Sequence, residues 1–284
     1  MTDLPDRPEL RRKRKTAFHT SEEDLYAAQR IPRTPQTEAP AYRLAFADGD
    51  FLTREELRPV RLQLELLKPE LILQEHEIAS TVIVFGGARV PAPGADPGGK
   101  NDIQRKKLAE KAHFYEEARK FAELVSEASK THDMKEFVVA SGGGPGVMEA
   151  ANKGARDAGA YSIGFNIVLP HEQAPNEYVS PELCFNFHYF AIRKMHFLMR
   201  ARAVAVFPGG FGTLDELFEV LTLIQTERAE RMPIILFGEK FWRGIINFEV
   251  LADEGTISPE DIELFEFVET AEQGWEIIKD YYGL

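Results

Sequence analysis

The chain has 284 residues, of which 44% are hydrophobic, and its formal net charge at pH 7 is -12. That is enough apolar material for one large or two modest domains, whereas so acidic a surface disfavours nucleic-acid binding, which depends on neutralising phosphates. No apolar run approaches the roughly 20 residues of a membrane span. The single cysteine, Cys184, excludes an internal disulfide, is expected to pack in the core and fits a cytoplasmic location.

The first 80 residues differ in character from the rest. Residues 1–42 are charged, contain prolines and show no periodicity, so we expect a disordered or surface-draped tail. No apolar segment follows its basic run at 11–15, which argues against a secretory signal. Residues 43–80 are expected to form a helical extension, in which Thr53 and Glu56 have the spacing of a helix start and Pro69 interrupts an apolar run.

From residue 81 to residue 284, strand and helix patterns alternate. Short apolar runs predict buried strands at 82–85, 137–140, 161–167, 183–188, 203–207, 234–237 and 265–268. Apolar residues at helical spacing predict helices at 103–129, 147–158, 189–202, 214–224, 242–251 and 271–281. This alternation predicts an α/β fold with a doubly wound, mainly parallel sheet and helices on both faces. Ligands of such sheets bind beyond the carboxyl ends of the strands, where the strand order reverses.

The stretch 203–226 carries the strongest functional signal. A buried strand runs into Pro208-Gly209-Gly210-Phe211-Gly212, and a helix follows at once. Such a junction directs free backbone N–H groups and the positive end of the helix dipole at one point, which suits a phosphate. Thr213 and Glu216 also have the spacing of a capping box, which needs no ligand, but a capping box does not explain the three glycines.

A second glycine turn, residues 141–146, follows the strand at 137–140. It matches neither the G-x-G-x-x-G fingerprint nor the phosphate loop with Lys-Ser/Thr, so neither NAD nor ATP is supported. Gly143, Gly144 and Gly146 leave their backbone open to a ligand, although a tight strand-to-helix connection is the alternative interpretation. Because each glycine turn follows a strand, all of them are expected to meet at one edge of the sheet.

Few other side chains suggest chemistry. His188 and His196 are eight residues apart and lack the spacing of a zinc helix, so no metal site is expected. No G-x-S-x-G elbow is present either. Arg193 and Glu216 lie on the helices before and after the central strand and could face the same crevice. There a guanidinium binds phosphate or ribose oxygens and a carboxylate orients water. The alternative for Arg193 is a surface ion pair.

These residues resemble the motifs of the LONELY GUY family, also labelled lysine-decarboxylase-like Rossmann proteins. The family pattern P-G-G-x-G-T-x-x-E is complete at 208–216, and its G-G-G-x-G-x-M-E-A turn is complete at 142–150. The family's arginine-lysine pair is Arg193-Lys194, and its opening turn F-G-S-A-R stands at 85–89 with Gly87 in place of serine. The resemblance covers about residues 80–280 and implies a Rossmann-like, nucleotide-binding catalytic domain at 81–284.

The resemblance implies a phosphoribohydrolase, which hydrolyses the N-glycosidic bond of AMP or a cytokinin riboside 5′-monophosphate to free base and ribose 5-phosphate. It implies Arg193 and Glu216 as the catalytic pair, without a metal or organic cofactor. The positions that it implies for substrate binding are Gly87, Arg89, Gly143, Gly144, Gly146, Met148, Glu149, Lys194, Pro208, Gly209, Gly210, Gly212 and Thr213.

The residues leave alternatives to this function. A protein of the same fold that binds a nucleotide or the molybdenum cofactor without turning it over is the alternative function. A decarboxylase would need pyridoxal phosphate and a Schiff-base lysine, and no lysine is placed for that role. Family members are dimers or larger, so a homo-oligomer is expected by analogy, while the preferred base and the choice between cytokinin production and nucleotide salvage are not specified.

Overall fold

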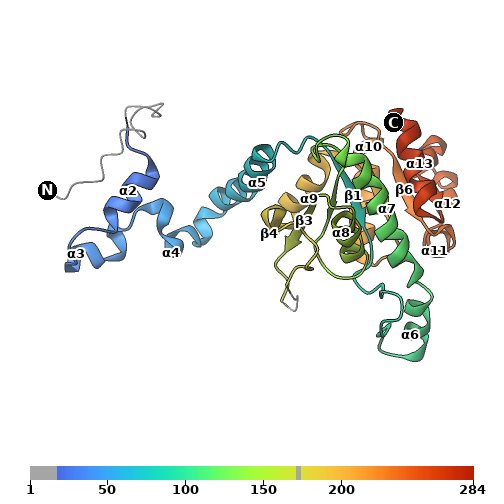
Figure 1. The fold of residues 1–284 in the computed structure, drawn as a ribbon, viewed down its shortest axis with the longest axis horizontal. Helices are drawn as coiled ribbons and strands as arrows, with labels where there is room; N and C mark the ends of the chain where they lie inside the picture. Colours follow the sequence, from blue (N-terminus) through green and yellow to red (C-terminus); the bar gives the residue numbers. More distant parts are fainter. Residues whose placement is uncertain (1–17, 171–173) are drawn as a thin grey trace. The chain divides into compact units, whose positions relative to one another are not determined.

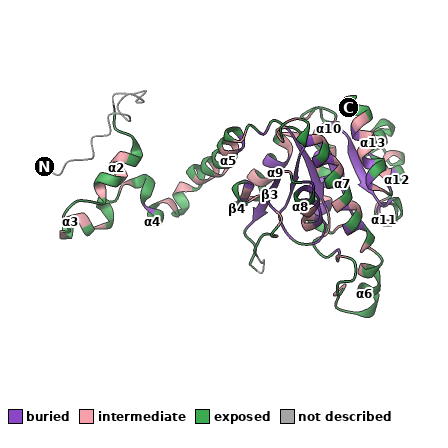
Figure 2. Ribbon diagram, viewed as in Figure 1, coloured by how far each residue is buried: buried purple, intermediate pink, exposed green. Residues whose placement is uncertain are grey.

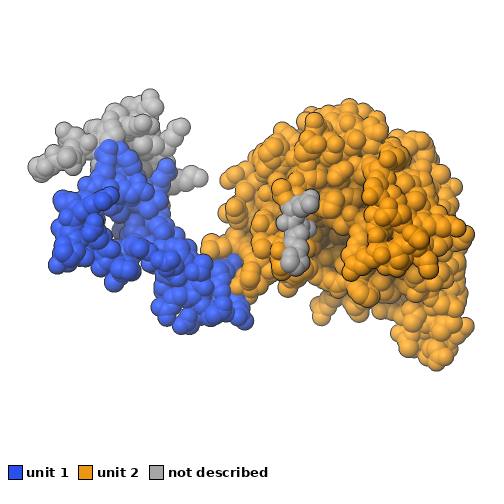
Figure 3. Space-filling view, turned by 90° about the horizontal axis from the view of Figure 1, so that it is seen from below, with its two compact units in different colours: residues 1–61 blue, residues 62–284 orange. Residues whose placement is uncertain are grey.

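The structure is a computed structural model in which residues 18–170 and 174–284 are described. The chain divides into two compact units, Met1–Arg61 and Leu62–Leu284, coloured separately in Figure 3. The predicted basic run at 11–15 lies outside the described residues. No helix within the described ranges is both long enough and apolar enough to cross a membrane.

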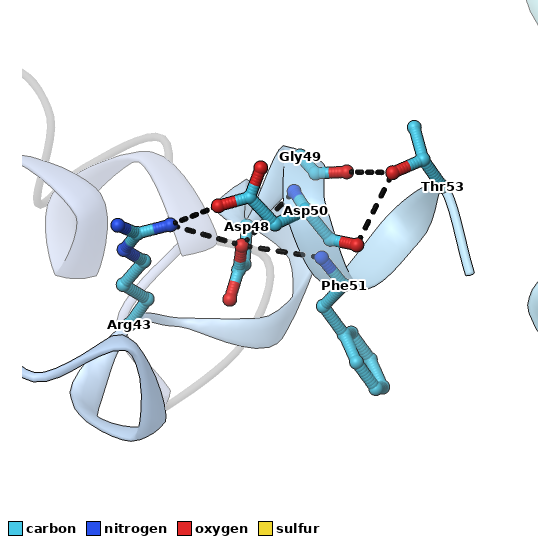
Figure 4. Close-up of polar contacts among 6 residues, drawn as sticks. All are labelled: Arg43, Asp48, Gly49, Asp50, Phe51 and Thr53. Atoms are coloured by element: carbon cyan, nitrogen blue, oxygen red, sulfur yellow. Dashed lines mark hydrogen bonds and ion pairs between the residues drawn. The ribbon is translucent and has the colours of Figure 1, made fainter.

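From residue 18 onward, the first unit contains short helices. They are α2 (Ser21–Ala28), α3 (Pro35–Glu38), η1 (Pro40–Tyr42), η2 (Ala45–Ala47), α4 (Gly49–Leu52) and η3 (Glu55–Leu57). Thr53 is the C-terminal cap of α4, so the prediction that it starts a helix was wrong. The local reason is that its hydroxyl donates to the carbonyl of Gly49 at 2.9 Å and so closes the turn behind it (Figure 4).

Local polar contacts dominate this first unit. Asp48 Oδ1 accepts hydrogen bonds from the backbone N–H groups of Asp50 and Phe51 at 3.1 and 3.3 Å, which caps α4. Arg43 Nη1 lies 2.8 Å from Asp50 Oδ2 and 3.4 Å from Asp48 Oδ1 (Figure 4). Among residues 18–61, Asp48 is the only buried one, so the described part of this unit has no apolar core of its own (Figure 2).

Helix α5 (Arg58–Glu75) contains the boundary between the two units and includes Pro69. The expectation that Pro69 interrupts this segment was therefore wrong. Proline removes one backbone donor and disfavours a helix interior, but Pro69 is buried and Leu73, one turn later, is only 1% exposed. Packing of this turn onto the sheet outweighs the local preference, as tertiary contacts commonly do for helices.

The second unit contains a seven-stranded, fully parallel sheet in the order β4-β3-β2-β1-β5-β6-β7. The strands are β1 (Thr81–Phe85), β2 (Val138–Ser141), β3 (Ser162–Ile167), β4 (Cys184–Phe187), β5 (Ala201–Val206), β6 (Ile234–Phe237) and β7 (Glu266–Val268). All seven predicted strands are confirmed, with ends that differ by at most a few residues. The predicted parallel sheet is confirmed as well.

Alternation along the central strand β1 explains the layers of this unit. Val82 and Val84 enter one apolar cluster, with side chains of α7 (His113–Lys130), α8 (Val147–Asp157) and α13 (Ala271–Tyr282). Ile83 and Phe85 enter the other, with side chains of α9 (Phe190–Met199), α10 (Phe211–Gln225), α11 (Glu239–Ile245) and α12 (Phe248–Asp253). Helices therefore cover both faces, as Figures 1 and 2 show, and the buried residues concentrate on the sheet.

Three helix predictions needed correction. The segment 103–129 forms two helices, α6 (Asp102–Ala109) and α7, and 242–251 forms α11 and α12. The second break occurs because the Asn247 side chain accepts from the N–H of Val250 and starts a new helix. The helix predicted at 189–202 already ends at Met199, since Arg200 is its C-terminal cap and β5 begins at Ala201.

Candidate functional site

The site forms where the strand order reverses. Strand β1 pairs with β2 on one side and with β5 on the other, although β5 follows four strands later in the chain. The turns that follow these three strands, at 86–89, 141–146 and 207–210, leave the same carboxyl edge of the sheet because all strands are parallel. This is the position at which open α/β sheets bind ligands.

Backbone hydrogen bonds join the three turns. The N–H of Gly87 donates to the carbonyl of Pro208 at 3.0 Å, and the N–H of Val147 donates to the carbonyl of Gly87 at 3.3 Å. A Cβ on Gly87 would lie 2.9 Å from the Pro208 oxygen, and one on Gly146 would lie 2.5 Å from the Gly87 oxygen. Gly146 also has a φ of +70°, which side chains disfavour. The expectation that the glycine turns meet at one edge is confirmed.

A network of polar side chains supports the second turn, and sequence reasoning missed it. The Ser141 hydroxyl donates to Asn152 Oδ1 at 2.8 Å and accepts from the N–H of Gly143 at 3.0 Å. Asn176 donates from Nδ2 to the carbonyl of Gly144 at 3.0 Å and to Asn152 Oδ1 at 3.0 Å. One signal was available, because Asn152 interrupts the small apolar face of α8 and is fully buried.

The third turn leads into the N-terminus of α10. The helix begins at Phe211 with Gly210 as its N-cap, and no side chain caps it. The capping-box interpretation of Thr213 was therefore wrong, because the helix begins two residues earlier and Thr213 lies buried within its first turn. The first backbone N–H groups of a helix have no intrahelical partner. Apart from the adjacent residues and the helix's own backbone, no atom lies within 4 Å of a Cβ built on Gly210 or Gly212, so the backbone there is open to a ligand.

Glu216 follows one turn further along α10 and is 8% exposed. Its burial raises the pKa of the carboxyl group to about 7, against the nearby positive charges of Lys194 and Arg193, which lower it. A carboxyl group with such a pKa changes its charge near neutral pH. Strongly shifted carboxyl groups in clefts are typical of functional sites, because burial and a specific charge partner act on them together.

Arg193 comes from α9 and reaches the second glycine turn. Its Nε donates to the carbonyl of Phe165 at 2.7 Å, and its guanidinium carbon lies 5.1 Å from the ring centre of Phe197. Its Nη2 lies 2.7 Å from the position that a Cβ on Gly142 would occupy. The charge of Arg193 also lowers the pKa of Glu216, so the two predicted catalytic side chains are close enough to interact electrostatically.

The other predicted binding residues have mixed surroundings. Lys194 Nζ lies 2.9 Å from Asp215 Oδ2 and from Glu219 Oε2, so its charge is shared with two carboxylates of α10. Glu149 Oε1 accepts a 2.7 Å hydrogen bond from the hydroxyl of Tyr115. Met148 Sδ lies 2.7 Å from the Cβ position of Gly142, while Arg89 is exposed after β1 and Gly209 packs its Cα side against Thr213.

Cys184 is the one thiol of the chain. Burial raises the pKa of the Cys184 thiol, whose Sγ accepts from Asn166 Nδ2 at 3.4 Å, so this half-buried cysteine has little thiolate character. In the part of the chain that the structure describes, no group of three or more His, Cys, Asp or Glu side chains is arranged to hold a metal ion.

The fold and the site together define a doubly wound α/β protein with free helix N-terminal amides, a buried carboxyl group and a guanidinium at its switch point. Residues 148–278 match the family described as "Possible lysine decarboxylase". Curated relatives include the cytokinin riboside 5′-monophosphate phosphoribohydrolases LOG3 and LOG7 of Arabidopsis thaliana. These matches support membership of the LONELY GUY family, whose motifs the sequence resembles.

The identities to these relatives are low. LOG3 is 26% identical over 147 residues, which cover 51% of this chain and 67% of LOG3. LOG7 is 30% identical over 129 residues, which cover 43% of this chain and 56% of LOG7. Among solved structures, a Moco carrier protein from Chlamydomonas reinhardtii is 15% identical with a TM-score of 0.46, over 72% of this chain and 98% of that one.

Proposed function

We propose that the protein is a nucleoside 5′-monophosphate phosphoribohydrolase, which hydrolyses the N-glycosidic bond of AMP or a cytokinin riboside 5′-monophosphate. One observation carries this proposal, the position of Glu216. Burial raises its pKa to about 7, the charge of Arg193 acts on it, and it lies one helical turn after the open backbone of Gly212. Family membership and the names of the curated relatives support the same reaction.

In the proposed complex, the 5′-phosphate accepts hydrogen bonds from the free N–H groups at the start of α10, where the helix dipole also attracts it. Gly210 and Gly212 permit this approach because no protein atom occupies the space beside them. The turns at 86–89 and 141–146 then face the ribose. Arg193 contacts ribose oxygens beside C1′ with its guanidinium, whose orientation the bond to Phe165 helps to fix.

The proposed reaction breaks the bond between C1′ of the ribose and the base nitrogen, and it forms a bond between C1′ and a water oxygen. The sugar passes through an oxocarbenium-like state, as in other glycoside hydrolyses. The ionised carboxylate of Glu216 stabilises this positive charge and accepts a proton from the attacking water. The base takes up one proton from solvent as it leaves, and Glu216 returns the water proton to solvent, so that one water molecule is consumed and ribose 5-phosphate is the second product.

The test is an assay of the purified full chain for free base. AMP and isopentenyladenosine 5′-monophosphate are incubated with the wild type, with Glu216→Ala and with Gly244→Ala, a control in α11 whose position has open space. We expect base release by the wild type and the control, and loss of turnover with retained nucleotide binding in Glu216→Ala. Binding of AMP by the wild type without release of any base would favour a binding protein instead.

Self-association into a dimer or larger assembly, in a cytoplasmic setting, belongs to the same proposal. The support for self-association is an apolar surface on the outer sides of α9 and α10, where several large side chains are exposed. These are Phe190, Met195, Met199, Phe211 and Phe218. Light scattering coupled to size-exclusion chromatography measures the mass of the protein in solution. A monomer at all concentrations would contradict this part of the proposal.

A further inference from the structure

Helix α9 carries Arg193, and side chains of α5 hold it at both ends. At its N-terminus, Glu65 Oε1 accepts the N–H of His188 at 2.8 Å and Glu65 Oε2 accepts the N–H of Tyr189 at 3.0 Å. The side chain of Tyr189, the N-cap residue of α9, does not cap the helix. A carboxylate at this position accepts from two backbone donors and complements the positive end of the helix dipole.

The second contact lies at the other end of α9. Glu70 and Arg200 form two parallel hydrogen bonds of 2.6 and 2.7 Å, and Arg200 Nε donates to the carbonyl of Ile78 at 3.1 Å. The bonds with Arg200 lower the pKa of Glu70, so this pair is charged at neutral pH. A two-pronged pair fixes orientation as well as distance, which a single lysine contact does not do.

The contact made by Glu65 lies only four residues before Arg193 along the chain. The N–H of Arg193 donates to the carbonyl of Tyr189 at 3.2 Å, and Glu65 holds the N–H of that same Tyr189. Arg193 therefore stands one helical turn from the cap. Glu65, which lies 124 positions before Tyr189 in the chain, thus helps to fix the backbone from which the Arg193 side chain extends.

We propose that Glu65 and Glu70 of α5 are positioning residues that splint α9 and so align the Arg193 guanidinium with the substrate. This inference rests on the proposed function, because it assigns the alignment to the hydrolysis reaction. The phosphate site at the start of α10 does not depend on this splint, since Gly210 and Gly212 are on another helix. Loss of the splint should therefore reduce the rate of the chemical step and leave the grip on the phosphate largely intact.

The experiment compares Glu65→Ala, Glu65→Gln and Glu75→Ala in the full chain. Glu75 is an exposed residue in the last turn of the same helix, so its removal controls for loss of one acidic side chain from α5. With AMP as substrate, we expect Glu65→Ala to lower kcat on the order of ten-fold, because small displacements of a reacting group are costly. KM should stay within about two-fold, and Glu75→Ala should behave as the wild type.

Glu65→Gln provides the rescue. It keeps one acceptor oxygen and the shape of the side chain, so it should recover part of kcat and it remains informative if Glu65→Ala does not fold. A purely structural role predicts lower stability of Glu65→Ala with unchanged kcat per folded molecule. That result, or an equal effect of Glu75→Ala, overturns the proposal.

Hydrogen exchange separates this inference from the proposed function. If the wild type releases no base from any nucleotide, the proposed function fails, and exchange of the amides at 190–199 still tests the splint. Faster exchange there in Glu65→Ala than in Glu75→Ala supports a splint that holds α9, and equal exchange rejects it. If the wild type is active, the kinetic comparison and the exchange measurement must agree.

Discussion

The backbone N–H of Gly87 donates a 3.0 Å hydrogen bond to the carbonyl oxygen of Pro208, and this bond ties the end of β1 to the end of β5. The two turns that flank the strand-order reversal are thus fixed to each other by the main chain. A site built in this way needs little rearrangement when an anion enters, which is the condition for electrostatic stabilisation at low cost. The glycines of these turns have different roles, some in folding and some in binding.

Gly212 is expected to serve the ligand and not the fold. Gly212→Ala meets no protein atom within 4 Å and lies in a helix, where alanine is favoured over glycine by about 0.5–1 kcal/mol. We expect unchanged or higher stability in denaturant, but a KM for AMP that rises on the order of ten-fold, since the methyl group fills space that the phosphate needs. Gly244→Ala in α11 has the same open surroundings and should leave KM unchanged; an equal KM in both variants would contradict the phosphate assignment.

Gly146 is expected to serve the fold. An alanine there combines a φ of +70° with a Cβ only 2.5 Å from the Gly87 oxygen, and we expect it to cost about 3 kcal/mol of unfolding free energy. Gly159→Ala is the matched control, because Gly159 has a φ of +72° with nothing within 4 Å. It should cost only about 1 kcal/mol. Urea unfolding measures both, and similar losses would show that the close contact with Gly87 is unimportant.

The absence of a side chain at Gly142 is expected to allow the Arg193 guanidinium its observed position. A Cβ on Gly142 would lie 2.7 Å from both Arg193 Nη2 and Met148 Sδ, which are the ends of flexible side chains. Gly142→Ala should therefore shift the guanidinium at a stability cost of about 1 kcal/mol or less, while kcat falls on the order of ten-fold. In an Arg193→Ala background the same change should have little further effect on kcat, because the two substitutions act through one group. Additive losses in this double-mutant cycle would argue against that coupling.

Glu216 predicts the pH dependence of the reaction. The proposed mechanism uses its carboxylate form, and burial raises its pKa to about 7. With AMP in excess, kcat should therefore rise between pH 5 and pH 8 with a midpoint near 7. The loss at low pH follows from protonation of Glu216, so Glu216→Gln should show a low rate without this midpoint. A wild-type rate that falls as pH rises through 7 would instead assign an acid role to this group.

The same shift predicts how stability changes with pH. The ordinary pKa of this carboxyl group is 4.5 and the folded value is about 7, so the folded state binds the proton more tightly than the unfolded state. Glu216 therefore costs stability as pH rises between these values, by at most about 3 kcal/mol. Glu216→Gln cannot ionise and should gain stability over the wild type at pH 8 compared with pH 4. Unfolding curves at both pH values check this, and a constant difference would mean that the carboxyl group is better solvated than its burial indicates.

The layers of the sheet and the position of the site could be predicted from sequence because their signals are local. Short β-branched runs mark the strands, and the glycine turns directly follow them. The start of α10 was harder, since Thr213 and Glu216 fit a capping box in sequence, while the structure begins the helix at Phe211. Thr213 does not cap this helix, because the chain enters it two residues earlier with Gly210 as the N-cap.

The contacts that support the site were not predictable in the same way. Asn176 reaches Gly144 across 32 residues, and Glu70 reaches Arg200 across 130 residues. No periodicity or spacing rule connects such positions, because the fold alone determines that they are neighbours. The buried Asn152 was the one member of these networks that left a trace in sequence, as a polar residue within an apolar helix face.

Glu65 and Glu70 have a practical consequence for protein engineering. Both precede residues 148–278, the segment that matches the family, yet they hold a helix inside that segment. A chimera that transplanted 148–278 alone into a related scaffold would leave two backbone donors and the Arg200 guanidinium without their acceptors. Including residues 62–80 in the graft would preserve the contacts of Glu65 and Glu70. The smallest transferable part of this protein is therefore longer than the segment that matches the family.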